Sequence, residues 1–229
     1  MNSKNPQNAL LNNMKPFSSS PGVPPRQTID EKIWPWSSIG LLEVGNQNAS
    51  VFGSGFMYAP DVIVTAKHNF TQVSDWDAAG VWLEFNSNET PHKKYDIYPP
   101  QFHSQLDLAI AILADCNVNP LNISHIIPSE DILLGGYGVV RSDGSKWLTY
   151  GSGKISKTNL SSVTYLLNTN EGDSGAPIII YDKTYKVIGI HTQGLNDTDG
   201  SSNFNHGILL TQNVISDINN MISAARNNI

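Results

Sequence analysis

The chain has 229 residues, a formal net charge of −6 at pH 7, 39% hydrophobic residues and 15% charged residues. This composition is that of an acidic globular protein and argues against binding to nucleic acid through phosphate neutralisation. The single cysteine, Cys116, excludes an internal disulfide framework and a multi-cysteine metal site, and no run of about 18 apolar residues predicts a membrane span.

The N-terminal segment, residues 1–32, is polar and rich in proline, with no periodic apolar face. It has too few apolar side chains to offset the entropy lost on ordering, which predicts a flexible tail or a pro-like segment. It also lacks the uninterrupted apolar stretch of a secretory signal.

From Ile33 onward, short apolar runs rich in β-branched and aromatic residues alternate with turn-forming clusters. Eleven such runs cover residues 37–44, 50–58, 61–66, 80–85, 95–99, 107–113, 132–140, 162–169, 176–181, 186–192 and 206–211. Runs of this length with no helical pattern between them predict an antiparallel all-β barrel or sandwich. The polar segment 116–131 divides them into two sets.

The end of the chain follows a different pattern. Apolar residues recur there with the spacing of about 3.6 residues that indicates a helix, at Val214, Ile215, Ile218, Met221 and Ile222. Either Thr211 or Asn213 is placed to cap this helix.

Three short segments carry residues that can do chemistry. Thr65-Ala66-Lys67-His68 ends a strand in a histidine, Asp107 opens an apolar strand, and Ser174 lies in the glycine-bracketed turn Gly172-Asp173-Ser174-Gly175. Each segment alone is more often structural than catalytic. Together they supply a nucleophile, a base and a carboxylate for acyl transfer.

The chemistry needs these residue types together. A serine hydroxyl is a poor nucleophile at neutral pH unless a base takes its proton, and histidine serves because its ordinary pKa is about 6.5. A carboxylate on the other ring nitrogen fixes the tautomer. The glycines beside Ser174 allow the Gly172 and Ser174 amides to point at one spot, as an oxyanion hole requires.

The order His, Asp, Ser differs from that of subtilisin-type enzymes and of α/β-hydrolases. The segments TAKH, DLAI and GDSGAP resemble the three catalytic blocks of the trypsin-like (chymotrypsin-fold) serine proteases, over about residues 33–225. The resemblance implies a serine endopeptidase with His68 as general base, Asp107 as its orienting carboxylate and Ser174 as nucleophile. It also implies an oxyanion hole at Gly172 and Ser174, and no metal or organic cofactor.

The same resemblance implies an all-β fold of two six-stranded antiparallel β-barrels with a C-terminal α-helix and the active site between the barrels. We expect a tail at 1–32, an N-terminal barrel at 33–122 with His68 and Asp107, and a C-terminal barrel at 123–229 with Ser174.

A narrower resemblance is to bacterial glutamyl endopeptidases and exfoliative toxins. It rests on the segment 187–191 ending in His191, on Thr169 five residues before Ser174, and on the segments 205–208 and 35–39. These relatives carry a specificity histidine and a pocket-wall threonine at the first two positions.

The resemblance also indicates the substrate pocket. Its base corresponds to Asn168, which is neutral and so disfavours cleavage after Lys or Arg. Thr169 and a protonated His191 on the walls suit a glutamate carboxylate, because charge-assisted hydrogen bonds are the stronger ones. We therefore expect cleavage after Glu, with Asp weaker because its stem is shorter.

Activation is a separate question. Asp173 occupies the position at which an aspartate of trypsin-like zymogens pairs with a newly cut amino terminus, and Arg26 is a candidate processing site in the tail.

The alternative function is a catalytically silent protease-fold binding module, which the presence of all three triad residues disfavours. A stress-response chaperone-protease would append a peptide-binding domain that is not apparent here. We expect a monomer that acts on proteins or peptides.

Asn69-Phe70-Thr71 fits the Asn-x-Ser/Thr pattern of N-glycosylation sites. A glycan there would crowd the cleft beside His68, which argues against passage through a glycosylating pathway. Together with the cysteine count, this predicts a bacterial protein that is secreted or delivered to host cells without a recognisable signal peptide. A cytoplasmic location is the alternative.

Overall fold

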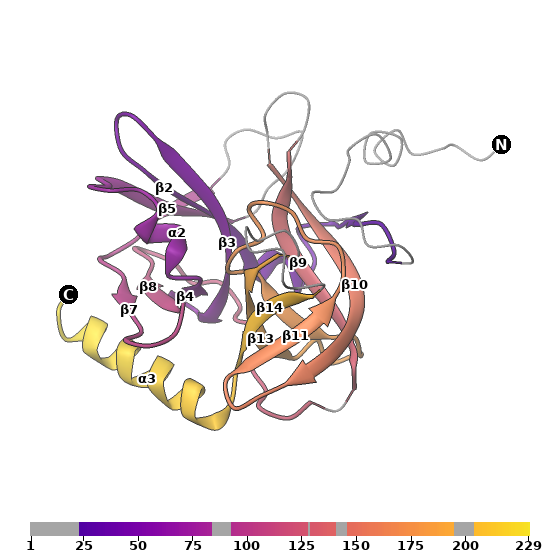
Figure 1. Cartoon of the computed structure of the whole chain (residues 1–229). Helices are drawn as coiled ribbons and strands as arrows, with labels where there is room; N and C mark the ends of the chain where they lie inside the picture. Colours follow the sequence, from indigo (N-terminus) through magenta and orange to yellow (C-terminus); the bar gives the residue numbers. More distant parts are fainter. Residues whose placement is uncertain (1–22, 84–92, 128, 141–145, 195–203) are drawn as a thin grey trace.

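The computed structural model describes residues 23–83, 93–127, 129–140, 146–194 and 204–229, and these form two β-structures and one long helix (Figure 1). Residues 1–22 of the expected tail lie outside the described residues. No helix in the described ranges is long and apolar enough to cross a membrane.

The N-terminal sheet contains seven antiparallel strands in the order β6-β5-β2-β3-β4-β8-β7. Its strands are β2 (Ile39–Gly45), β3 (Ser50–Ala59), β4 (Val62–Thr65), β5 (Ala78–Leu83), β6 (Lys93–Asp96), β7 (Gln101–Phe102) and β8 (Ala109–Ile112). The sheet curls so that a single bridge joins Ile97, beyond β6, to Leu113, beyond β8. The central strands β4 and β8 are buried throughout, as their uninterrupted apolar sequences predict.

The C-terminal barrel is a closed ring of six antiparallel strands, since β9 pairs with both β10 and β12. Its strands are β9 (Asp131–Val140), β10 (Lys146–Thr158), β11 (Ser162–Leu166), β12 (Pro177–Ile180), β13 (Val187–Gln193) and β14 (Asn205–Leu209). The prediction of an all-β fold of the chymotrypsin type is confirmed. Within the described residues, the N-terminal half differs from the expected six-stranded barrel in being a curled sheet of seven strands.

The longest strand, β10, was not among the predicted runs. Three of its four large apolar or aromatic side chains lie in its first five residues, and the remainder, Gly151–Thr158, is Gly, Ser, Lys and Thr apart from Ile155. Hydrogen bonding to β9 on one side and β11 on the other forms the strand despite this composition, since pairing context outweighs β-propensity.

The described part of the expected tail, residues 23–32, is attached to the barrel at two points, although half of its residues are exposed; the assignment of 1–32 as a tail or pro-like segment stays a prediction. Strand β1 (Gln27–Thr28) pairs with β10, and Arg26 is only 8% exposed. The apolar count failed to reveal this because the anchor is a buried guanidinium with polar partners.

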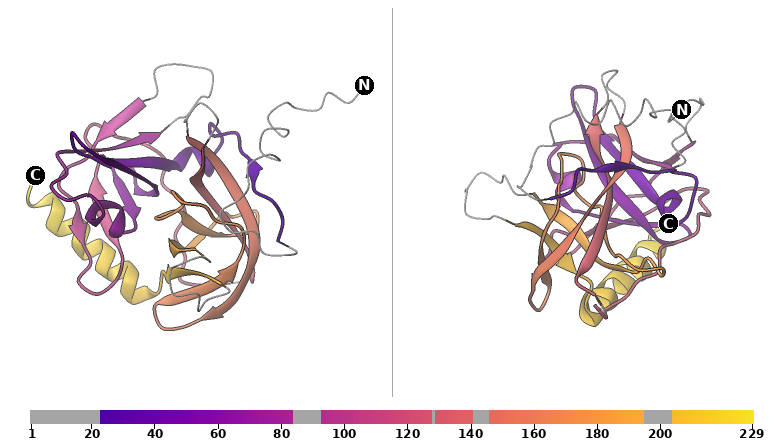
Figure 2. Two further views of the ribbon diagram at one scale, coloured as in Figure 1. Left: turned by 45° about the horizontal axis from the view of Figure 1, so that its top comes forward. Right: turned by 90° about the vertical axis from the view of Figure 1, so that its right-hand side faces the viewer.

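The predicted C-terminal helix is α3 (Gln212–Arg226), and it begins directly after the barrel strand β14. It crosses to the N-terminal sheet and packs against β7 and β8, as Figure 1 and the left view of Figure 2 show. Its buried side chains are Val214, Ile218, Ile222 and Ala225. A charged pair joins Arg226 to Asp61 of the N-terminal half at 2.7 Å.

The cap of α3 supplies a stability prediction. The Thr211 side chain accepts a hydrogen bond from the Val214 amide, whereas the exposed Asn213 makes no cap bond. Thr211→Ala should lower the free energy of unfolding by about 1 kcal/mol, measured by urea denaturation. The control Asn213→Ala should change it by less than about 0.5 kcal/mol; equal effects would contradict the cap assignment.

Candidate active site

Two paired strands of the N-terminal sheet bring His68 and Asp107 together. His68 begins the short helix α2 (His68–Thr71) just after β4, and Asp107 lies just before β8, which pairs with β4. His68 Nδ1 lies 2.6 Å from Asp107 Oδ2, and the His68 amide donates to Oδ1 at 2.8 Å. Within the described ranges His68 Nε2 makes no hydrogen bond, so it is available to a third group.

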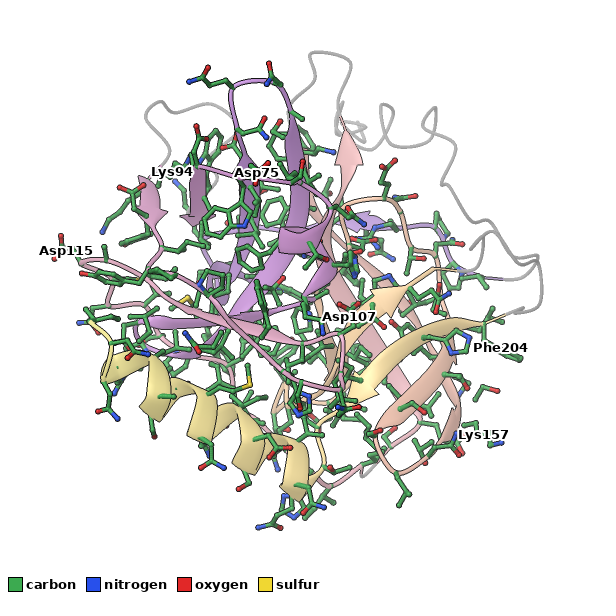
Figure 3. The ribbon with its side chains drawn as sticks, turned by 60° about the vertical axis from the view of Figure 1, so that its left-hand side comes forward. Asp75, Lys94, Asp107, Asp115, Lys157 and Phe204 are labelled. Carbon is green, nitrogen blue, oxygen red and sulfur yellow. The ribbon has the colours of Figure 1, made fainter. Side chains whose placement is uncertain are left out.

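The electrostatics of this pair fix its protonation. Burial alone would raise the pKa of Asp107, but the hydrogen bonds and charge of His68 outweigh it, and the pKa is lowered. The carboxylate is therefore ionised at neutral pH and accepts the proton carried by Nδ1. Figure 3 shows Asp107 near the middle of the molecule, between the N-terminal sheet and the C-terminal barrel.

A second histidine holds the turn that presents Asp107. His103 Nδ1 accepts the amides of Gln105 and Leu106 at 3.1 and 2.9 Å, and its Nε2 lies 3.3 Å from Asp217 on α3. Since Nδ1 is an acceptor, the ring proton lies on Nε2. His103 is thus structural: it ties the turn before Asp107 to the C-terminal helix.

Ser174 lies in a turn whose glycines are required by conformation and by space. Gly172 has φ +99° and Gly175 has φ +89°, values that residues with a Cβ rarely adopt. A Cβ at Gly175 would also collide with the Ser54 carbonyl oxygen and the Thr65 hydroxyl. The turn therefore lies directly against the N-terminal sheet.

Hydrogen bonds from the N-terminal sheet hold the Ser174 backbone next to His68. The Ser174 carbonyl accepts the Ser54 amide at 2.8 Å and the Asn69 side-chain Nδ2 at 2.9 Å. Asn69 directly follows His68, so this bond brings the two backbones together. The triad assignment of His68, Asp107 and Ser174 stays a prediction that this arrangement supports.

Two amides in the turn remain open. In the residues that the structure describes, Gly172 N and Ser174 N donate no hydrogen bond, whereas the Asp173, Gly175 and Ala176 amides donate to carbonyls. Two open amides in one turn are what an oxyanion hole needs.

Between these two amides, the Asp173 side chain points into a fully buried site. Its Oδ1 accepts the Gly138 amide at 3.1 Å and its Oδ2 accepts the Asn170 amide at 2.8 Å. The Arg26 guanidinium binds both oxygens, at 2.8 and 3.0 Å. Burial raises the pKa of Asp173, and Arg26 and the two amides oppose that rise. The burial of Arg26 also corrects its assignment as a processing site, since a protease needs exposed backbone.

The predicted pocket residues lie in a hydrogen-bonded group on the barrel. The Thr169 hydroxyl donates to Asn205 Oδ1 at 2.9 Å, and Asn205 Nδ2 donates to the Leu167 carbonyl. The Tyr165 hydroxyl bonds to His191 Nδ1 at 2.5 Å. Strand β14 lies between β11, which carries Tyr165, and β13, which carries His191.

Asn168 is held apart from this group by the N-terminal segment. Its Nδ2 donates to the Pro24 carbonyl at 2.8 Å, and its Oδ1 is buried without a hydrogen bond in the described residues. Its side chain is therefore bound to residues 23–26, and its assignment as the pocket base stays a prediction.

The charge of His191 differs from the expectation. Burial, with smaller contributions from Arg26, His68 and His206, lowers the pKa of His191 to about 3. The imidazole is therefore neutral at pH 7 in the free protein, and the expectation of a protonated His191 does not hold for that state. The sequence did not reveal this burial, which leaves His191 only 2% exposed.

Comparison with known proteins agrees with this geometry. The fold and the site define a chymotrypsin-fold serine protease. The family model for the trypsin-like peptidase domain matches residues 53–190, more than half of the chain, and the protein belongs to that family. The matched range contains His68, Asp107 and Ser174.

Two solved structures share the fold. A Glu endopeptidase in complex with MPD has a TM-score of 0.68 and 21% identity, with 85% of this chain and 94% of that chain covered. GrC, granzyme C, has a TM-score of 0.67 and 18% identity, with 86% and 98% covered. A search of curated sequences found no significant match.

The roles of several residues around the site escaped the sequence analysis because their hydrogen-bond partners are distant in the chain. These residues are Arg26, Ser54, Asn69, Tyr165 and Asn205. Only Asn69 carried a local signal, its place directly after His68.

Ser54 supplies a test of how the two halves are joined. Its buried hydroxyl donates to the Gly172 carbonyl at 2.7 Å and accepts the Tyr137 amide at 2.9 Å. Ser54→Ala removes both bonds and should lower the free energy of unfolding by about 1–3 kcal/mol, measured by urea denaturation. The control Ser50→Ala, exposed on the same strand, should change it by less than about 0.5 kcal/mol. An unaltered Ser54→Ala would contradict this role.

Proposed function

We propose that the protein is a serine endopeptidase that cleaves peptide bonds through an acyl-enzyme on Ser174 and prefers Glu on the acyl side. The observation that carries the proposal is the His68–Asp107 pair beside a turn that holds Ser174 and two open amides.

In the first step, the Ser174 hydroxyl oxygen bonds to the substrate carbonyl carbon while His68 Nε2 takes the hydroxyl proton. The carbonyl oxygen becomes an oxyanion, and the Gly172 and Ser174 amides donate to it. His68 then gives its proton to the leaving nitrogen as the peptide bond breaks. In the second half, water gives a proton to His68 and bonds to the acyl carbon; the ester bond to Ser174 then breaks, and His68 returns the proton to the Ser174 oxygen.

Asp107 contributes orientation and charge. Its two oxygens fix His68 through the ring Nδ1 and the backbone amide, so the second ring nitrogen is the one left to accept a proton. The carboxylate also stabilises the imidazolium that forms when His68 takes that proton. None of these steps calls for a metal or an organic cofactor.

The first prediction for this function concerns the triad. Ser174→Ala and His68→Ala should each remove nearly all hydrolysis of an unfolded, fluorescently labelled protein, because nucleophile and base act as a unit. Asp107→Asn should lower kcat by about 10⁴-fold, since it favours the wrong tautomer. A fluorophosphonate should label the unaltered protein and leave Ser174→Ala unlabelled.

The matched control is Ser50→Ala, an exposed serine on β3 that should retain full activity and labelling. Unchanged activity in Ser174→Ala would overturn the mechanism. A folded protein that neither hydrolyses nor reacts would indicate the alternative, a silent binding module.

The preference for Glu is supported by the Tyr165–His191 pair and by the Glu endopeptidase among the structural neighbours. Burial raises the pKa of the Tyr165 phenol well above its usual value, so the hydroxyl keeps its proton and can donate it to His191 Nδ1. The ring proton then lies on Nε2, from which a neutral imidazole donates to a carboxylate. The Thr169 hydroxyl, which now donates to Asn205, adds a second bond once it rotates toward the substrate.

The second prediction concerns this pocket. His191→Leu should lower kcat/KM for a Glu substrate by about 10–100-fold, because it removes one hydrogen bond to a charged group. The kcat/KM for a matched Leu substrate should change far less. The Glu-over-Gln ratio of kcat/KM should stay constant from pH 6 to pH 8, since a group with a pKa of about 3 does not titrate there.

The comparison of Glu, Gln, Leu and Lys peptides identical outside the varied residue measures both effects. A preference that falls across pH 6–7, or cleavage dominated by Lys, Arg, Phe or Leu, would contradict this pocket and leave the triad untouched.

A further inference from the structure

We propose that Arg26 is a positioning residue for catalysis: its guanidinium holds the Asp173 turn in its working geometry, so the uncut chain is already competent. This inference rests on the proposed peptidase function.

The Arg26 guanidinium is bound along its whole edge. Its Nε donates to the Thr149 hydroxyl at 2.8 Å, and its Nη2 donates to the Thr149 carbonyl at 2.9 Å and the Gly136 carbonyl at 3.3 Å. Its Nη1 donates to the Asn168 carbonyl at 3.1 Å, and both terminal nitrogens bind Asp173. A planar fork with five N–H donors suits this arrangement, whereas a single ammonium does not.

The Asp173 carboxylate depends on this cation. Its side chain has no exposed surface and Arg26 is its ion-pair partner in the described residues. Removing one partner of a buried ion pair leaves an uncompensated charge, which is strongly destabilising. The turn can relieve that charge by swinging the carboxylate toward water.

Such a swing would disturb catalysis directly. Asp173 lies between Gly172 and Ser174 in the chain, so any rotation of its backbone redirects the two open amides and displaces the Ser174 hydroxyl. The His68–Asp107 pair, on the other half of the molecule, would keep its geometry. The loss should therefore fall on kcat, through oxyanion stabilisation and attack.

The segment before β1 also binds Asn168, which lies close to the turn in the sequence. The Pro24 carbonyl accepts the Asn168 side chain, and Arg26 binds the Asn168 carbonyl. Residues 24–26 thus hold both Asn168, two residues after the end of β11, and the turn at Asp173. The charge pair that an activating cut would have to create is already present in the uncut chain.

The test compares kcat and KM of the full chain, with its length verified by intact mass, for the unaltered protein, Arg26→Ala, Arg26→Lys and the control Gln27→Ala. Gln27 is adjacent and exposed, and in the described residues its side chain accepts one hydrogen bond, from the Tyr150 hydroxyl. Arg26→Ala should lower kcat about 100-fold, the size of effect seen when an oxyanion donor is lost, with little change in KM. Arg26→Lys should lie between, and Gln27→Ala should be unaffected.

A chemical rescue separates positioning from general loss of structure. Guanidinium ion at low millimolar concentration should restore part of the kcat of Arg26→Ala, because it can occupy the vacated site beside Asp173. It should not change the kcat of Gln27→Ala. The His68–Asp107 hydrogen-bond proton, observed by NMR, should persist in Arg26→Ala.

The outcomes are distinguishable. An unaltered protein without hydrolytic activity under any condition would defeat the proposed function itself. An active uncut protein whose Arg26→Ala variant keeps its kcat would overturn this inference alone, as would activity that appears only after N-terminal trimming. Should Arg26→Ala fail to fold, Arg26→Lys decides: a tenfold or larger fall in kcat at a similar melting temperature supports the inference, and an unchanged kcat overturns it.

Discussion

A carboxylate without access to water is the constraint on which the structure around the turn depends. Asp173 is fully buried, and four donors from three parts of the chain converge on it: Arg26, with two nitrogens, Gly138 and Asn170. The Asp173 carboxylate also requires space beside strand β9. A Cβ at Gly136 would collide with Asp173 Oδ1, and one at Gly138 would lie 2.7 Å from its carboxyl carbon. Gly136 and Gly138 therefore leave the space that the carboxylate needs, since a buried charge is tolerated only where donors reach it closely.

The turn anchored in this way is also the surface on which the two halves meet. From the barrel side it is held by Asp173, and from the sheet side by Ser54 and Asn69, whose bonds go to the backbone of Gly172 and Ser174. The side chains that would do the chemistry are thus divided: His68 and Asp107 belong to the sheet, and Ser174 belongs to the barrel. Their alignment depends on the contact between the halves. The few polar groups at that contact therefore have a large effect on the geometry of the site.

Short sequence patterns predicted the features that depend on neighbouring residues alone. His68, Asp107 and Ser174 each stand in a short segment with its own signature, and the helical spacing of Val214, Ile218 and Ile222 placed α3. Long-range pairing was not readable. Arg26 and Asp173 are 147 residues apart, and nothing near Arg26 distinguishes it from a surface arginine in a polar segment. The neutral state of His191 follows from burial that only the assembled barrel creates. Strand β10 escaped because neighbouring strands, not its own composition, hold it.

The ends of the described chain are exchanged between the halves. Residues 24–28 precede the N-terminal sheet but bind the C-terminal barrel, whereas α3 follows the barrel but covers β7 and β8 of the sheet. Chains fold from the N-terminus as they are synthesised, so the sheet leaves the ribosome with the apolar surface destined for Val214, Ile218 and Ile222 still uncovered. The barrel that must enclose Arg26 does not yet exist. The barrel cannot close until β14, residues 205–209, has been made, and the sheet cannot reach its final packing until residues 212–226 follow. The order of synthesis therefore delays assembly of the site until α3 has been made.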